Sequence, residues 1–225
     1  MHPLVFEAFD RLCREHDAGG DVLEIGATPD ASTLLCLPAL AGAKSRVGVN
    51  LEGAAAFDGF RIVGANANDL AGFADASFDT VLSNSVLEHD ARFWLTLAEM
   101  RRVARPGALI AIGVPGFASS GPRRPLKRLA RLPLAGRIVR RLAAARLATT
   151  PTLDVHAFPG DYYRFSPLAV REVLLAGLEA PDVVALMSPP RLLGSGRVPK
   201  GSRQPPGTRA RDTEPTLARP SAPFG

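Results

Sequence analysis

Strand-like segments alternate with helix-like segments over the first 115 residues, and this alternation constrains the fold more than any other feature. The strand-like segments are short, apolar and rich in β-branched residues, whereas the helix-like segments repeat apolar residues every three or four positions. Strands that alternate with helices form a mainly parallel sheet with helices on both faces. The sequence therefore predicts an α/β fold.

The expected elements divide the chain into a domain and a tail. Helices are expected at about 3–16, 31–40, 88–104 and 166–176, and strands at 22–25, 46–51, 60–63, 78–82, 109–114, 183–187 and 192–198. These elements predict one domain, residues 1–198, with a seven-stranded sheet and a helical insert after the fifth strand. Residues 199–225 are rich in Pro, Gly and Arg without apolar periodicity, which predicts a disordered tail.

Composition is that of an ordinary soluble protein and names no function. The chain has 225 residues, of which 46% are hydrophobic and 22% are charged. Cys13 and Cys36 lack the spacing of a zinc site or a disulfide framework, so no metal site is expected and a reducing cytoplasm is favoured. The first 20 residues contain acids and no long apolar run, so we expect neither a signal peptide nor a membrane span there.

Positive charge is concentrated in the insert. Residues 121–150 contain nine Lys or Arg and no acid, whereas the rest of the chain is net acidic. This distribution argues against a protein that coats nucleic acid, and no specific nucleic-acid partner is expected. Three interpretations of the segment stay open: a lid over an acidic substrate, a helix in peripheral contact with an anionic membrane, and a solvated helical insert.

The loop after the first predicted strand, in the stretch VLEIGATPDAS, is a candidate cofactor site. Gly26 ends the strand, but the later glycines of a dinucleotide loop are absent, and Pro29 removes a backbone N–H that a pyrophosphate would need. A dinucleotide oxidoreductase is therefore disfavoured. S-adenosylmethionine carries no phosphate; Gly26 can supply its tight turn, and Glu24 can organise its ammonium group. Alternatively, Glu24 only caps the helix that follows.

Four stretches resemble, in the right order, the class I S-adenosylmethionine-dependent methyltransferases, particularly the type 11 subgroup. VLEIG resembles the first motif, RVGVNLE the second-strand motif, GANANDLAGFADASFDTVLSNSVLEH the adenine loop and fourth strand, and EMRRVARPGALIAIGVP the helix, turn and fifth strand. The resemblance implies a Rossmann-like methyltransferase fold with S-adenosylmethionine as cofactor. The cofactor contacts that it implies are made by Glu24, Gly26, Ala27, Thr28, Asn50, Leu51, Ala67, Asn68, Ser83 and Asn84.

The chain departs from the family pattern at two places. Thr28 and Asp30 stand where the family usually has glycine, and Asn50 stands where it usually has an acid. An amide can bind a ribose hydroxyl but lacks the strength of a charge-assisted bond. The departures predict a reduced affinity for the cofactor, and in the alternative Asn50 only forms a turn.

His89, Tyr162 and Tyr163 are the candidate catalytic residues on the acceptor side. A neutral imidazole can take a proton from a hydroxyl or an amine, so His89 is a candidate general base; alternatively, it packs over the cofactor. The stretch HAFPGDYYRFSP, at the end of a basic and aromatic insert over residues 121–165, resembles a segment that builds the acceptor pocket in some family members. It places both tyrosines at the acceptor, with Arg164 against an anionic group. Alternatively, these aromatic residues pack on the core.

Together these features predict a cytoplasmic methyltransferase that acts on a small-molecule, glycan or lipid-linked acceptor, an anionic one included. The alternative function is a catalytically weak methyltransferase-like protein that binds a partner or associates with a membrane through the basic insert.

Overall fold

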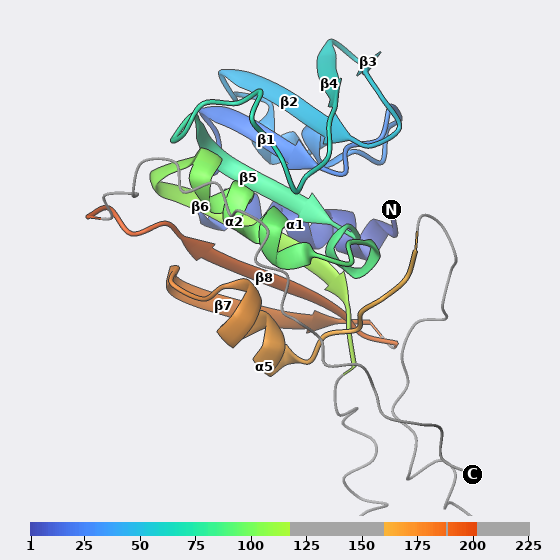
Figure 1. Ribbon diagram of the computed structural model, residues 1–225, viewed down its shortest axis with the longest axis vertical. Coiled ribbons are helices and arrows are strands. Elements are labelled where there is room, and N and C mark those ends of the chain that lie inside the picture. Colours follow the sequence, from blue (N-terminus) through green and yellow to red (C-terminus); the bar gives the residue numbers. More distant parts are fainter. Residues whose placement is uncertain (118–159, 188, 202–225) are drawn as a thin grey trace, which may run out of the picture.

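One mixed sheet forms the centre of the described part of the protein. The computed structural model describes residues 1–117, 160–187 and 189–201. In these residues eight strands are hydrogen-bonded in the order β3-β4-β2-β1-β5-β6-β8-β7, and Figure 1 shows them from β3 and β4 at the top to β7 at the bottom. The strands are β1 (Asp21–Ile25), β2 (Ser45–Asn50), β3 (Ala55–Phe57), β4 (Phe60–Gly64), β5 (Phe78–Asn84), β6 (Ala104–Pro115), β7 (Glu179–Leu186) and β8 (Arg191–Arg197).

Strand pairing is mainly parallel, as expected. β1 pairs in parallel with β2 and β5, and the pairs β2–β4 and β5–β6 extend the parallel part. β3, β7 and β8 run antiparallel to their neighbours. The α/β class is confirmed, but the expected number of seven strands is wrong for the described residues. The extra strand, β3, forms a hairpin with β4 because Asp58 and Gly59 adopt positive φ angles of 47° and 79° in the turn.

Helical segments cover both faces of the sheet. They are α1 (Pro3–Glu15), η1 (Leu34–Cys36), η2 (Pro38–Leu40), η3 (Leu87–His89), α2 (Phe93–Val103), α5 (Pro167–Ala169) and η4 (Val170–Leu174). None of the helices in the described ranges is long and apolar enough to cross a bilayer. The basic segment at 121–150 and the tail from residue 202 onward lie outside the described residues, so the expected helical insert is not tested.

Two expected helices differ from the structure. The helix expected at 31–40 is replaced by the 3-10 turns η1 and η2, because Pro38 has no N–H and the Glu24 carboxylate accepts the N–H of Leu35 at 3.2 Å. The helix expected from residue 88 begins instead at Phe93. The reason is a local turn, in which Asp90 Oδ1 accepts the N–H of Arg92 at 2.8 Å.

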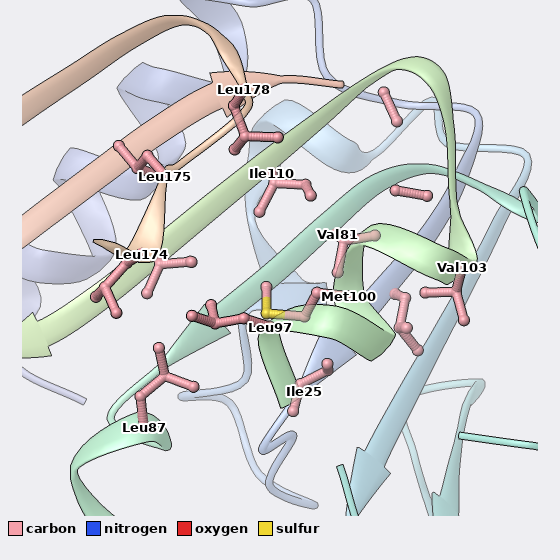
Figure 2. Packing of buried hydrophobic residues seen from close by; sticks show 14 of the residues in the cluster. Ile25, Val81, Leu87, Leu97, Met100, Val103, Ile110, Leu174, Leu175 and Leu178 are labelled. Atoms are coloured by element: carbon pink, nitrogen blue, oxygen red, sulfur yellow. The ribbon is translucent and has the colours of Figure 1, made fainter. Parts of the chain in front are cut away.

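Side chains that alternate along the central strands build two hydrophobic clusters. In β6, Leu109 and Ala111 belong to the cluster that α1 covers, while Ile110 and Ile112 belong to the cluster that α2 and η4 cover. Met100 of α2 is fully buried in the second cluster, and Figure 2 shows it there with side chains from β1, β5 and β6. Both faces of the parallel strands are therefore buried, which leaves their ends as the place for a site.

Replacing Met100 with alanine tests the contribution of the α2 cluster. We expect Met100→Ala to lower the free energy of unfolding by about 2–5 kcal/mol, because the buried side chain leaves a cavity. Urea unfolding followed by circular dichroism measures the change. The control Val173→Ala removes methyl groups from an exposed side chain and is expected to stay within about 0.5 kcal/mol of the parent. Equal losses in the two variants would contradict the role given to this cluster.

Candidate active site

The carboxyl ends of β1, β5 and β6 meet at one edge of the sheet. The parallel register sets Ile25 of β1 beside Ser83 of β5, and Asn84 of β5 beside Gly113 of β6. In open parallel sheets the ligand site lies outside this edge. The edge therefore brings the loop after β1 close to the polar end of β5.

The loop after β1 is shaped by Gly26. Its φ angle of 85° is left-handed, and a Cβ at this position would lie 2.3 Å from Val86 Cγ2. The N–H groups of Gly26 and Ala27 both donate to the carbonyl of Val49, at 2.8 and 3.1 Å. Asn50 Nδ2 donates to the Ala27 carbonyl at 2.6 Å. The structure thus brings Gly26, Ala27 and Asn50 together.

Asn50 also makes a local turn. Its Oδ1 accepts the N–H of Glu52 at 3.0 Å, which is the turn-forming geometry that was the alternative for this residue. The next residue, Leu51, is one of the exposed large hydrophobic residues. Both polar atoms of the Asn50 side chain are therefore engaged by the protein.

The Glu24 carboxyl lies inside the protein and holds the segment after the loop. Its Oε2 accepts the hydroxyl of Thr33 and the N–H of Leu35. Burial raises the pKa of Glu24 to about 7, although these hydrogen bonds oppose the shift. This geometry is that of the capping alternative. Thr28 Oγ1, in the loop itself, lies 3.4 Å from Ser32 Oγ.

The expected adenine loop is tied to the start of α2. Asn68 Nδ2 donates to Asp90 Oδ2 at 2.6 Å and to Thr96 Oγ1 at 2.8 Å, and Ala67 packs against the α2 cluster. Asp90 and Thr96 were not singled out from the sequence. Asp90 lies just after the VLEH stretch, but a lone Asp there carries no signal for this contact.

Two polar atoms at the end of β5 have no hydrogen-bond partner in the described residues. They are Ser83 Oγ and Asn84 Oδ1, and both are buried. A buried polar atom without a partner costs about 1–3 kcal/mol, and such atoms call for an explanation by water or a ligand. Both residues were expected to contact the cofactor.

The expected acceptor segment is distant in the sequence from the strand ends that it contacts. The chain re-enters the described part at Gly160 and passes the carboxyl ends of β5 and β6 on its way to α5 (Figure 1). Tyr162 N–H donates to the Glu88 carbonyl at 2.7 Å, and Phe165 N–H donates to the Pro115 carbonyl at 3.1 Å. Residues 160–165 are therefore docked on η3 and the end of β6.

His89 contacts this segment through its ring. Its Nδ1 lies against the Gly160 carbonyl, and because a carbonyl only accepts, Nδ1 carries the proton of this hydrogen bond. In the neutral ring Nε2 is then the basic nitrogen. This tautomer suits the expected role of His89 as a base.

The two tyrosines differ in their surroundings. Tyr163 packs its ring 5.0 Å from that of Phe93, and its hydroxyl donates to the Ala91 carbonyl at 2.9 Å. Tyr162 is 57% exposed. The structure therefore brings His89 together with both tyrosines, and Tyr162 is the more exposed of the two.

Sequence reasoning missed Glu88 and its charged neighbours Asp161 and Arg191. Glu88 has no exposed side-chain area, and Arg191 Nη1 lies 3.7 Å from its Oε1. Arg164 forms a two-point ion pair with Asp161, so its guanidinium is already engaged. Glu88 directly precedes His89 in VLEH. In the sequence Glu88 looks like an exposed acid at the start of a helix, and only the tertiary contacts show that it is buried. In the described ranges, no three His, Cys, Asp or Glu side chains are placed to share a metal ion.

The buried carboxyl of Glu88 makes stability depend on pH. Burial raises the pKa of Glu88 from the ordinary 4.5 to about 7, although the residue's own backbone N–H, Arg191 and Arg164 partly oppose the shift. The folded state therefore holds this proton more tightly than the unfolded state. The stabilising contribution is complete below pH 4.5 and is lost as the pH rises through 7.

We expect Glu88→Gln to reduce the fall in the free energy of unfolding between pH 5 and pH 8 by up to about 3 kcal/mol. Urea unfolding at a series of pH values measures this. Part of the fall in the free energy of unfolding remains in the variant, because burial also raises the pKa of Glu24 to about 7. Glu15→Gln, at an exposed position, is the control and should leave the pH dependence as it is. An unchanged pH dependence in Glu88→Gln would show that Glu88 has an ordinary pKa.

Comparisons with known proteins find a methyltransferase domain and solved methyltransferase structures of similar fold. A family described as "Methyltransferase domain" matches residues 33–112. The solved structures that match include a Burkholderia thailandensis 1,6-didemethyltoxoflavin-N1-methyltransferase with bound S-adenosylhomocysteine, at a TM-score of 0.55 and 18% identity, covering 87% of this chain and 78% of that one. An S-adenosylmethionine-dependent methyltransferase from Archaeoglobus fulgidus matches at a TM-score of 0.53 and 15% identity, covering 86% and 93%.

The structural likeness alone establishes only the fold. The [4+2]-cyclase SpnF also matches, at a TM-score of 0.57 and 11% identity, covering 87% of this chain and 81% of that one. A comparison with curated protein sequences finds no significant match. The match to the methyltransferase domain family adds evidence for the activity, which the fold alone does not give. It agrees with the four ordered stretches that resemble methyltransferases in the sequence. Residues 33–112 thus match a methyltransferase domain, and the described residues share the fold of S-adenosylmethionine-dependent methyltransferases.

Proposed function

We propose that this methyltransferase acts on a small molecule that binds between η3 and residues 160–165. One observation carries the proposal: this segment is hydrogen-bonded onto Glu88 and Pro115, beside the carboxyl ends of β5 and β6. An acceptor held there lies next to Ser83 and Asn84, which we assign to the cofactor. Support for a small-molecule acceptor comes from the Burkholderia relative, whose name describes N1-methylation of 1,6-didemethyltoxoflavin.

The residues at the sheet edge fit S-adenosylmethionine. The left-handed conformation of Gly26 lets the backbone turn closely at the end of β1. The buried Ser83 Oγ and Asn84 Oδ1 have no hydrogen-bond partner in the described residues, so both atoms can bind polar groups of the cofactor. When bound, the cofactor supplies a methyl group that its sulfonium already activates. Ala27, Thr28, Asn50, Leu51, Ala67 and Asn68 would complete the contacts. Glu24 would act indirectly, by holding the loop through Thr33 and Leu35.

The protein's part in the transfer is placement and proton acceptance. Methyl transfer needs the acceptor atom in line with the methyl carbon, and holding it there accounts for much of the rate. His89 Nε2 would take the proton of a hydroxyl or an amine, since Nδ1 is committed to Gly160. Tyr162 would border the acceptor from the exposed side.

A second candidate function is that of a slow methyltransferase that serves mainly as a binding protein. It is favoured by the position of the Glu24 carboxyl, which is used inside the protein, and by Val86, which lies against Gly26. Membrane contact through the basic insert would belong to this candidate, but the insert lies outside the described residues. Cofactor binding without release of S-adenosylhomocysteine across a broad acceptor panel would support it.

Titration calorimetry with S-adenosylhomocysteine tests the cofactor site. We expect the parent protein to bind and Gly26→Ala to bind at least about tenfold more weakly, because a left-handed non-glycine residue costs about 1–2 kcal/mol and the new Cβ would clash with Val86. The control Gly42→Ala places its Cβ in open space and should retain the parent's affinity. Failure of the parent to bind would contradict the proposed cofactor site.

A further inference from the structure

Glu88 is a buried acid whose carboxyl group lacks hydrogen-bond donors. Both Oε1 and Oε2 are buried and have no hydrogen-bond partner in the described part of the chain. Arg191 Nη1, at 3.7 Å, and His89 Nε2, at 3.9 Å, are near Oε1 but beyond hydrogen-bond distance. A buried carboxylate normally accepts several hydrogen bonds, so this one is incomplete.

The charged neighbours of Glu88 are held by other groups. Arg191, at the start of β8, donates to Ser85 Oγ at 2.7 Å. Arg164 and Asp161, in the docked segment, pair with each other, with Nη2 and Oδ2 at 2.6 Å. His89, next to Glu88 in η3, directs Nδ1 to Gly160. The surroundings therefore lower the cost of a charge on Glu88 without supplying the donors that its oxygens need.

Glu88 lies on the acceptor side of the site. Its carbonyl accepts the N–H groups of Tyr162 and Tyr163, at 2.7 and 3.3 Å, so it is directly beneath the docked segment. Val86, two residues earlier, contacts the cofactor loop at Gly26. The chain thus passes from the cofactor loop to the acceptor segment within three residues.

The charges at this position disfavour an anionic ligand. An anion would lie beside the carboxyl groups of Glu88 and Asp161. Asp161 neutralises Arg164 and Arg191 balances Glu88, so these groups offer an anion no net positive charge. An amine or a hydroxyl would instead provide the donors that Glu88 lacks. An amine or hydroxyl acceptor differs from the anionic acceptor that we expected from Arg164 in the sequence.

We propose that Glu88 accepts a hydrogen bond from the methyl acceptor, and that this enzyme therefore takes amine or hydroxyl compounds rather than carboxylates or phosphates. The inference rests on the proposed function, because it names the substrate class of the same site. Two neighbours of Glu88 reach solvent: the Arg191 side chain is 23% exposed and Tyr162 is 57% exposed.

Binding of three matched probes tests this assignment. Benzylamine, benzyl alcohol and benzoate share one ring, which suits the aromatic side chains of Phe93 and Tyr163, and differ in the polar group. Ligand-observed NMR titrations are done at pH 8, above the pKa of about 7 that burial gives Glu88, with and without saturating S-adenosylhomocysteine. We expect the parent protein to bind benzylamine about tenfold more tightly than benzoate, with benzyl alcohol between them.

Three variants separate a ligand contact from a structural role. Glu88→Gln should lose the preference for benzylamine, Glu88→Asp should retain part of it, and the exposed control Glu15→Gln should retain all of it. Circular dichroism confirms that each variant is folded. Equal or tighter binding of benzoate, no binding of benzylamine, or an unchanged preference in Glu88→Gln would overturn the proposal and leave Glu88 with a structural role only.

The two proposals fail in different ways. Absence of S-adenosylhomocysteine binding contradicts the proposed cofactor site, while the probe titrations without it still report on Glu88. Binding of S-adenosylhomocysteine without a preference for benzylamine contradicts only the role of Glu88.

Discussion

The parallel pairing of β1, β5 and β6 is the constraint on which the rest of the structure depends. Because the three strands run in one direction and both of their faces are buried, polar groups gather at the strand ends. The register then decides which groups meet: Ile25 lies beside Ser83, and Asn84 lies beside Gly113. The cofactor loop and the polar end of β5 are neighbours for this reason.

Two buried carboxyl groups lie near this edge and serve different purposes. Glu24 faces the α1 side of the sheet, where Thr33 and Leu35 supply its hydrogen bonds. Glu88 lies beneath the docked segment, where its oxygens have no donors in the described residues. Burial raises the pKa of both groups to about 7, so the difference between them is in hydrogen bonding rather than in burial. That difference is why we assign Glu24 to the scaffold and Glu88 to the ligand.

The segment 160–165 completes the site from a distance in the sequence. Its backbone pairs with Pro115, Gly116 and Glu88, and Phe165 is buried in the α2 cluster. Burial of Phe165 anchors the segment, whereas Tyr162 stays exposed above it. The proposed acceptor site therefore has one side on a segment whose position is set by apolar packing.

The sequence by itself determined the α/β class, most strand positions and the likeness to methyltransferases, because apolar periodicity and the order of the motifs are local properties. It also identified Gly26, where the backbone needs a left-handed turn. Only the tertiary structure decided that Pro38 and Glu24 replace a helix with 3-10 turns, and that Asp161 neutralises Arg164. Only the tertiary structure, likewise, decided that the Glu88 side chain is completely buried. Burial and pairing arise from contacts between distant segments, and no local pattern encodes them.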